Sequence, residues 1–310
     1  MTFRHTLIAL LVPLTWGFGF ALAKSGLDHF SPLFLMGIRF LIAAFVLVWF
    51  VPIPKGYLTQ IFLISFIAAT LQYGLTFSGL ARMSATPAVL LIQVEVAFGV
   101  IMAALLLGER PSIRQIIGIA VSFFGIVTIV GAPSLKGQML GVSLVLSGAL
   151  IWALGQVLIR RLKGALSGFQ LTAWIGVMAG PQMIISALFF EDNLLLQLTM
   201  APMSAWGTVL YLALIMTVIG YSAWYYVLAR YPVPMVMPIL LLLPVATILG
   251  AVTFLGESPD MTVLLGGIIV IFGVGSIIIE PKALSNSERK PAASRSEGKS
   301  LDTYSGPSGN

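Results

Sequence analysis

The sequence predicts an all-α membrane protein with ten transmembrane helices, arranged as two inverted-topology repeats of five helices each (5+5). The first observation behind this prediction is composition: 58% of the residues are hydrophobic, 9% are charged, and mean hydropathy is +1.02. A soluble domain carries about 25% charged residues. The second is that apolar runs of membrane-spanning length recur along the whole chain. The third is that short patterns of the first half return in the second half.

The spans follow from the length of the apolar runs, because about 20 residues at 1.5 Å per residue cross a hydrocarbon core of about 30 Å. Runs of this kind predict spans at 6–23, 32–51, 58–81, 86–107, 113–131, 139–159, 168–190, 205–228, 235–255 and 261–279. The connections are short and rich in Pro, Gly and charge, which leaves no room for a soluble domain. We therefore expect a first repeat at 1–135, a second at 136–282 and a disordered tail at 283–310.

Basic residues gather on one side of this topology. With the N-terminus inside, the inner connections carry Arg4, Lys55, Arg110, Arg114, Arg160, Arg161, Lys163 and Arg230, and the tail adds five more. The outer side carries Lys24, Arg82 and Lys136. The positive-inside rule therefore predicts that both termini and the tail are cytoplasmic. The formal charge of +6 reflects this topology, so no nucleic-acid partner is expected.

The two halves share residues at fixed offsets. Trp16, Gly19 and Lys24 return 136 residues later as Trp152, Gly155 and Arg160. From the third span onward the offset is 148, as when Gly108-Glu109 returns as Gly256-Glu257, and an insertion near Glu191 accounts for the change. Because five is odd, the halves enter the membrane from opposite sides, related by a pseudo-twofold axis in its plane. This organisation is typical of secondary transporters.

Several of these positions carry a resemblance to a known family. They are Trp16-Gly17, Lys24 with Gly26-Leu27, Pro32, Arg39-Phe40, Gly108-Glu109-Arg110 and Ile219-Gly220-Tyr221. Across about residues 6 to 280 the chain resembles the EamA family of the drug/metabolite transporter superfamily, and most of all bacterial amino-acid exporters of the EamA and YddG kind. The resemblance implies a 5+5 inverted repeat with a central cavity and export of small metabolites. The chain departs from the family at Gly19, where relatives often have Asn, and at Glu95, where they often have a neutral residue.

Arg39 and Glu95 are charged residues inside predicted spans, where a charge at the centre costs roughly 2.5 to 3.5 kcal/mol. Arg39 lies seven residues after Pro32 and Glu95 eight after Pro87, so both are expected about 10 to 12 Å below the outer face. One interpretation is a structural ion pair. The other is that they bind the carboxylate and ammonium of a zwitterionic substrate, or that Glu95 carries a proton, which leaves proton coupling open.

Further candidate substrate-binding residues share helix faces through i, i+4 spacing. Those residues are Trp16 and Phe20 on the first span, Gln72 and Thr76 on the third, Gln93 on the fourth, Trp152 and Gln156 on the sixth, and Tyr221, Trp224 and Tyr225 on the eighth. An aromatic stripe is also consistent with helix packing or an interfacial belt. Glutamines are costly against lipid, so we expect them to face the interior, where aromatic walls with a few polar groups form small-molecule sites.

Prolines within spans are candidate hinges, because each removes a helical hydrogen bond. We predict hinges at Pro13, Pro238 and Pro244, and a static bend is the alternative reading; Pro181 also lies within a span. Gly118 with Gly125, and Gly266 with Gly273, are predicted to pack helices closely.

The function predicted from these features is secondary export of small metabolites, most of all amino acids, by alternating access in a bacterial inner membrane. The alternatives are export of hydrophobic drugs or nucleotide-linked sugars and, from another class, an intramembrane enzyme. An enzyme is disfavoured because no Asp lies within a span and neither H-E-x-x-H nor G-x-S-x-G occurs. With no cysteine, the chain has no thiolate metal site, and no metal or cofactor is expected. The expected partners are a small-molecule substrate and the lipid bilayer.

Overall fold

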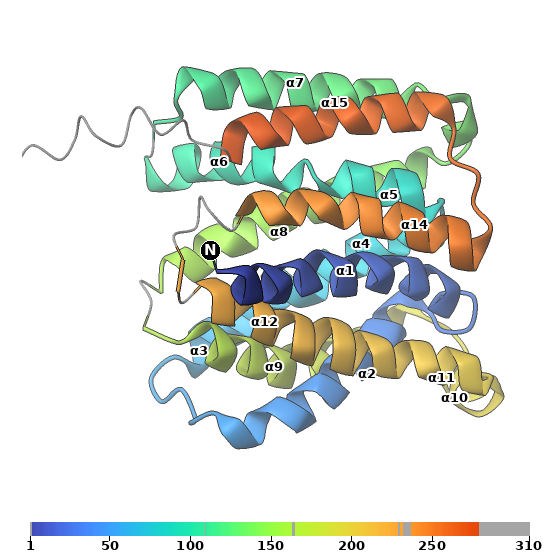
Figure 1. The fold of residues 1–310 in the computed structure, drawn as a ribbon. Coiled ribbons are helices and arrows are strands. Elements are labelled where there is room, and N and C mark those ends of the chain that lie inside the picture. The colour runs from blue at the N-terminus through green and yellow to red at the C-terminus, as the bar shows by residue number, and fades with distance from the viewer. Residues whose placement is uncertain (1, 109, 163–164, 229, 232–236, 279–310) are drawn as a thin grey trace, which may run out of the picture. The chain divides into compact units, whose positions relative to one another are not determined.

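The described part of the chain is helical, and its long helices lie side by side in the computed structural model (Figure 1). The structure describes residues 2–108, 110–162, 165–228, 230–231 and 237–278. Within these, only the backbone is described for Arg160, Tyr225, Leu228, Met237 and Pro238. The predicted tail at 283–310 lies outside the described residues. Residues Met1–Ile279 form one compact unit, which contains the predicted first half and the predicted second half as far as residue 279.

The helices follow one another with short connections. The first half contains α1 (Phe3–Gly26), α2 (Pro32–Leu47), α3 (Leu58–Ser65), α4 (Gln72–Ala81), α5 (Ala85–Ile92), α6 (Glu95–Leu107) and α7 (Ile113–Val130). The second half contains α8 (Met139–Arg160), α9 (Gly168–Phe190), α10 (Leu194–Met200), α11 (Met203–Leu210), α12 (Gly220–Leu228), α14 (Leu243–Leu255) and α15 (Met261–Ile278). Short 3-10 or π-helical segments are η1 (Val48–Phe50), η2 (Phe66–Leu71), η3 (Pro133–Leu135), η4 (Tyr211–Ile219) and η5 (Met237–Leu242).

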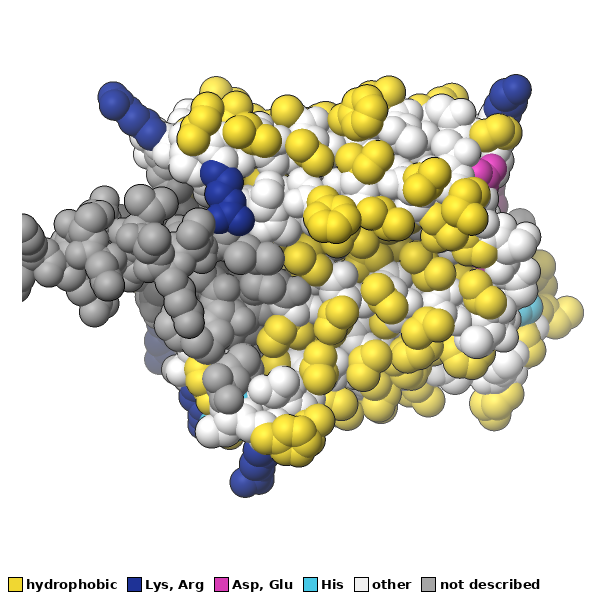
Figure 2. Space-filling view, turned by 45° about the horizontal axis from the view of Figure 1, so that its top comes forward, with side chains coloured by type: hydrophobic (Ala, Val, Ile, Leu, Met, Phe, Trp, Pro, Cys, Tyr) yellow, Lys and Arg dark blue, Asp and Glu magenta, His cyan; other side chains and the backbone are white. Residues whose placement is uncertain are grey.

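Almost every span predicted from the sequence corresponds to a helix long enough to cross a membrane. In the described residues, nine helices are long and apolar enough to cross a membrane: 3–26, 32–50, 58–81, 85–107, 113–130, 139–159, 168–190, 203–224 and 261–278. The tenth predicted span, 235–255, is described from Met237 onward and contains a shorter apolar helix, Ile239–Leu255. Figure 2 shows the matching surface, with hydrophobic side chains over the middle of the visible face and Lys and Arg side chains at its ends. The chain is therefore a multi-pass membrane protein.

Four of the spans are irregular near their middle. The third and eighth spans contain π-helical segments, η2 between α3 and α4 and η4 between α11 and α12. The fourth span breaks after Ile92, where Val94 N and Val96 N each donate to a carbonyl only three residues back. The ninth span changes from the 3-10 segment η5 to α14 at Leu243. Irregular backbone within a membrane is tolerated where it is buried in protein, and η2 and η4 each have a buried face, with Thr70 3% and Thr217 1% exposed.

These irregularities recur at a constant spacing. The first residues of α6 and α14, Glu95 and Leu243, are 148 residues apart, and so are the last residues of η2 and η4, Leu71 and Ile219. Helices α7 and α15 have both bounds displaced by the same number. In the earlier spans α1 and α8 begin 136 residues apart, and the short helix α10 lies where the spacing changes.

Helix ends also repeat. Gly108 follows α6 with φ of 70°, and Gly256 follows α14 with φ of 66°. This left-handed conformation is strained for any residue with a Cβ atom, so glycine is suited to both positions. Each glycine ends its span where the charged pattern Gly-Glu begins in the sequence.

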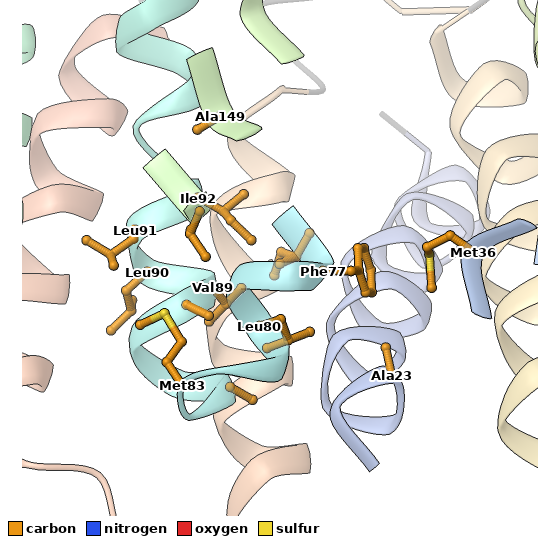
Figure 3. Close-up of a cluster of buried hydrophobic side chains, with 14 of the residues drawn as sticks. Ala23, Met36, Phe77, Leu80, Met83, Val89, Leu90, Leu91, Ile92 and Ala149 are labelled. Carbon is orange, nitrogen blue, oxygen red and sulfur yellow. The ribbon is translucent and has the colours of Figure 1, made fainter. Parts of the chain in front are cut away.

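Close contact between α7 and α15 confirms the predicted role of the glycines. A Cβ atom added to Gly118 would lie 2.8 Å from the carbonyl oxygen of Gly273, and one added to Gly125 would lie 2.8 Å from that of Gly266. The two backbones can approach this closely only because all four residues lack side chains. Elsewhere the buried core is built from apolar residues of several helices, and Figure 3 shows part of it around α4, α5 and α1.

Candidate functional site

Arg39 is a cation buried in the middle of the unit. Its side chain on α2 is 0% exposed, Nε donates to Thr217 Oγ1 at 2.9 Å, and one Nη contacts Met36 Sδ at 3.6 Å. The second nitrogen, Nη2, has no hydrogen-bond partner among the described residues. The guanidinium carbon lies 5.4 Å from the ring centre of Phe40 and 5.3 Å from that of Tyr73, within the range of cation–π attraction.

The ion pair predicted between Arg39 and Glu95 is absent from the described structure. Glu95 is half-buried as the first residue of α6, and no described residue forms a hydrogen bond or ion pair with its carboxylate. The guanidinium of Arg39 is instead held by Thr217 from the second half of the chain. Equal depth of two residues on different helices does not fix the directions of their side chains, and the prediction was wrong for this reason.

Aromatic residues of α1 and α12 form a cluster with Trp16 at its centre. Trp16 Nε1 donates to the carbonyl of Met216 at 3.1 Å, and its ring centre lies 4.8 Å from that of Tyr221 and 6.2 Å from that of Trp224. Trp224 is 8% exposed. Tyr221 and Trp224, two of the aromatic candidates predicted on the eighth span, therefore pack on the first span. Tyr225 is the third of these candidates, but its side chain lies outside the described residues.

A second set of rings extends from this cluster to Arg39. The hydroxyls of Tyr221 and Tyr73 lie 3.5 Å apart, and Tyr73 stacks on Phe77 with ring centres 5.6 Å apart. Phe77 in turn stacks on Phe20 at 5.8 Å. Phe40 meets Tyr73 edge to face at 5.1 Å. Rings from α1, α2, α4 and α12 thus form a continuous chain of contacts, of which Phe40 and Tyr73 lie next to the buried guanidinium.

The predicted polar residues of the third and fourth spans are buried. Gln72 Nε2 donates to Thr76 Oγ1 at 3.0 Å, while Gln72 Oε1 has no partner within the described chain. Gln93 is 7% exposed and lies at the break between α5 and α6. The expectation that the glutamines of these spans avoid lipid is confirmed for Gln72 and Gln93. A buried acceptor without a donor is unfavourable, and it can accept a hydrogen bond from a bound ligand.

The sixth-span candidates lie apart from the ring contacts. Trp152 and Gln156 are half-buried on α8, and in the described residues no hydrogen bond or ring contact joins either one to the rings around Arg39. The neighbouring Gly155 faces Ala68 of η2, where an added Cβ atom would lie 2.5 Å from the alanine Cβ. The structure therefore brings together the candidates on α1, α2, α4 and α12, and leaves those on α8 separate.

Sequence reasoning missed three residues that complete this arrangement as candidates: Tyr73, Phe77 and Phe40. Thr217 shares the helix face of Tyr221 and Trp224 through i, i+4 and i+7 spacing. Tyr73 and Phe77 are four residues apart, the same spacing that singled out Gln72 and Thr76 one position earlier. Tyr73 is also the counterpart of Tyr221 at the offset of 148. Either signal could have identified Tyr73 as an interior residue.

The predicted hinge prolines occupy different settings. Pro13 lies inside the continuous helix α1, as Pro181 does in α9. Pro244 is the second residue of α14, directly after the 3-10 segment η5, and only the backbone of Pro238 within η5 is described. Proline is therefore associated with irregular backbone in the ninth span. The fourth span breaks without proline, at Gln93 and Val94.

Comparisons with known proteins give a consistent result across most of the chain. The model of the EamA-like transporter family matches twice, at residues 4–131 and 139–279. A protein of Salmonella typhimurium named "Probable amino-acid metabolite efflux pump" is 31% identical over 88% of this chain and 94% of its own length. Its namesake in Escherichia coli is 29% identical over the same shares.

Two further similarities are more distant. A "Probable terminal-alkyne amino-acid exporter" of Streptantibioticus cattleyicolor is 27% identical over 63% of this chain and 65% of its own length. A crystal structure matches with a TM-score of 0.63 at 20% identity, covering 88% of this chain and 96% of its own, which supports the fold alone. The family model matches nearly all of the described chain, so the protein belongs to the EamA-like transporter family.

Proposed function

We propose that the protein exports amino acids across a bacterial inner membrane by alternating access, with Arg39 binding the carboxylate of the substrate. The observation that carries the proposal is the buried guanidinium of Arg39, which has no acidic partner among the described residues and one nitrogen without a hydrogen bond. A buried charge of this kind is costly unless it is paired, and charged residues inside membrane proteins are usually functional. The names of three relatives point to the same class of substrate.

The surroundings of Arg39 suit a small zwitterion. A carboxylate accepts two parallel hydrogen bonds from a guanidinium, and Nη2 is available for one of them. The rings of Tyr73, Phe77 and Phe20 supply apolar surface for a side chain. Gln72 Oε1, a buried acceptor one residue before Tyr73 with no partner among the described residues, is the proposed acceptor for the ammonium group. A nucleotide-linked sugar would require several cations for its phosphates, whereas Arg39 is the only basic residue in the middle of a described span.

The proposed architecture is a ten-helix inverted repeat. It is supported by the two matches of the family model, the equal spacing of helix bounds and the paired irregularities in four spans. The hydroxyls of Tyr73 and Tyr221, counterparts at the offset of 148, lie 3.5 Å apart, as residues next to a pseudo-twofold axis would. The domain bounds 1–135 and 136–282 follow from the same repeat.

The proposed moving parts are the prolines within spans, with hinges at Pro13, Pro238 and Pro244. Glu95 is the proposed proton carrier if export is coupled to protons.

The proposed orientation has both termini in the cytoplasm, from the excess of Lys and Arg at that end. Reporter proteins fused after Lys163 and after Lys282, which lie outside the described residues, should both read as cytoplasmic. A periplasmic signal from either fusion would contradict the orientation.

The test of function is flux in proteoliposomes. Purified protein should carry labelled neutral amino acids down their gradient, with competition among them and saturation. Trp152→Ala or Gln156→Ala should lower that flux without lowering folded yield if α8 lines the path, while Trp49→Ala, at a side chain 74% exposed, serves as the control. Saturable transport of a drug or nucleotide-linked sugar with no amino-acid flux would overturn the proposal.

A further inference from the structure

Close packing through glycine divides the interior helices into two bundles. In the first bundle α8 packs on α4, α5, α6 and η2, and a Cβ atom added to Gly79 of α4 would lie 2.8 Å from the carbonyl oxygen of Gly141 of α8. In the second bundle α1 packs on α14, η4 and α12, and one added to Gly17 of α1 would lie 2.7 Å from the carbonyl oxygen of Leu243 of α14. Backbones in such contact cannot shift past one another cheaply.

Contacts between the two bundles are of another kind: α5 also packs on α14, but no described glycine of either bundle has the backbone of the other bundle among its nearest neighbours. Phe20 of the second bundle stacks on Phe77 of the first, and Tyr221 of the second meets Tyr73 of the first. Rings and long side chains can separate without moving the backbone within either bundle. The seam between the bundles is therefore the place where the unit can open.

The end of this seam at the α4–α5 connection is held by two charged side chains of the second bundle. Lys24 of α1 donates from Nζ to the carbonyls of Leu80 and Ala81, at the end of α4, at 3.0 and 3.1 Å. Glu257, just after α14, accepts from Ala85 N at 2.6 Å and from Thr86 N and Oγ1 at 3.1 and 2.9 Å, at the start of α5.

The charges match the helix ends that they contact. Free carbonyls make the end of a helix negative and free N–H groups make its start positive, so an ammonium suits the end of α4 and a carboxylate suits the start of α5. Hydrogen bonds to charged groups are about twice as strong as neutral ones. Glu257 also lines a cleft of about 330 Å³ with Ser84, Ser134 and Asp260, so its carboxylate lies at the edge of the unit.

We propose that Lys24 and Glu257 form the outer latch of the transporter, which holds the first bundle against the second and must release for the seam to open to the outside. This rests on the proposed alternating access. The second bundle contributes both charged side chains of the latch, and the first bundle contributes both helix ends that they bind. Substrate bound near Arg39 leaves the cell only when these contacts are broken.

A reporter for opening is available on α1. Ala23 is 0% exposed and lies three residues after Phe20 and one before Lys24, on the face that meets α4. Figure 3 shows Ala23 on α1 and Phe77 and Leu80 on the neighbouring helix α4. The chain has no cysteine, so Ala23→Cys introduces a single thiol that a maleimide can label. Labelling is measured on the purified full chain in lipid nanodiscs, where both faces are accessible and no substrate is needed.

The expected result is slow labelling of Ala23→Cys alone, and labelling about tenfold faster when Glu257→Gln or Lys24→Gln is added, as loss of a charge-assisted hydrogen bond predicts. The matched control is Glu191→Gln. Glu191 caps α2 in the same way, accepting from Leu33 N at 2.7 Å and Phe34 N at 3.0 Å, but it binds neither the end of α4 nor the start of α5. This control should leave the labelling rate unchanged.

Three results would overturn the latch: no acceleration with Glu257→Gln, equal acceleration with Glu191→Gln, or no acceleration with Thr86→Val. The last variant removes a single hydrogen bond to Glu257 and serves if the glutamine variant folds poorly. The labelling rate tests the latch and the flux assay tests amino-acid export, so the two results are independent. Absence of amino-acid flux would not contradict the latch, and an unchanged labelling rate would not contradict amino-acid export.

Discussion

Tyr73 and Tyr221 place their hydroxyls 3.5 Å apart in the interior, one from each half of the chain and 148 residues apart in sequence. Through Tyr73 this contact reaches the guanidinium of Arg39, and through Tyr221 it reaches the ring of Trp16. The pair therefore joins the two sets of aromatic residues that surround the proposed substrate position.

The first prediction concerns this pair. Tyr73→Phe and Tyr221→Phe each remove the same contact, so the double variant should lower thermal stability by less than the two single changes together. A coupling of about 0.5 to 1.5 kcal/mol is expected for one hydrogen bond. Tyr73→Phe combined with Tyr226→Phe is the control and should be additive. Additivity of the Tyr73 and Tyr221 changes would show that the hydroxyls do not interact.

The second prediction concerns recognition of the carboxylate by Arg39. In liposomes the native protein should be inhibited by a free amino acid about tenfold more strongly than by its methyl ester, which lacks the carboxylate charge. Arg39→Gln should weaken inhibition by the free amino acid and leave that by the ester nearly unchanged. Equal preference of native and variant protein for the free acid over the ester would exclude Arg39 as the carboxylate anchor.

The third prediction follows from the absence of an ion pair between Arg39 and Glu95. Arg39→Gln and Glu95→Gln should change the melting temperature additively, since residues without a shared contact couple by less than about 0.5 kcal/mol. A double variant that is more stable than the two single changes together predict would show that the two residues interact, and would support the ion pair.

Glu95→Gln also tests proton coupling, because it should remove the pH dependence of flux and retain folding if the carboxylate carries the proton.

The fourth prediction concerns helix packing. Gly118→Ala should destabilise the protein by about 1 to 3 kcal/mol, the usual effect of overpacking, because the new Cβ atom would lie 2.8 Å from a carbonyl oxygen of α15. Gly99→Ala on α6 is the matched control, since nothing lies within 4 Å of its added Cβ atom. It should be neutral or stabilising by up to about 1 kcal/mol, as helix propensity favours alanine. Melting curves in detergent measure both.

The fifth prediction is a pH dependence at the start of α15. Thr262 N donates to Asp260 Oδ1 at 2.7 Å, and this hydrogen bond holds the pKa of the Asp260 carboxyl below its usual value. A depressed pKa in the folded state gives stability that is present above the unfolded pKa and is lost as pH falls through the folded one. Between about pH 5 and pH 2 the melting temperature should therefore fall less for Asp260→Asn than for the native protein. An equal fall in both proteins would contradict this.

Much of the candidate site could be found from helical spacing, but not the partners of its residues. The i, i+4 pattern identified Trp16, Phe20, Trp224 and the pair Gln72 and Thr76, all of which are at least half-buried. Helical spacing gives the face of one helix and says nothing about which other helix covers it. For that reason an ion pair of Arg39 with Glu95 is one interpretation of the sequence, whereas in the structure Arg39 Nε donates to Thr217 Oγ1.

The sequence by itself determined the spans, because apolar length and the charges between the runs decide which segments can lie in a membrane. It also determined that α7 and α15 each have a face suited to close packing, since glycines spaced seven residues apart mark one face of a helix, while the structure showed that these two faces meet. Tertiary structure alone decided where the third, fourth and eighth spans become irregular. The fourth span breaks at Gln93 and Val94 without proline, and η2 and η4 widen into π-helical turns within ordinary apolar sequence. Burial among other helices allows such backbone, and burial depends on contacts that no single segment encodes.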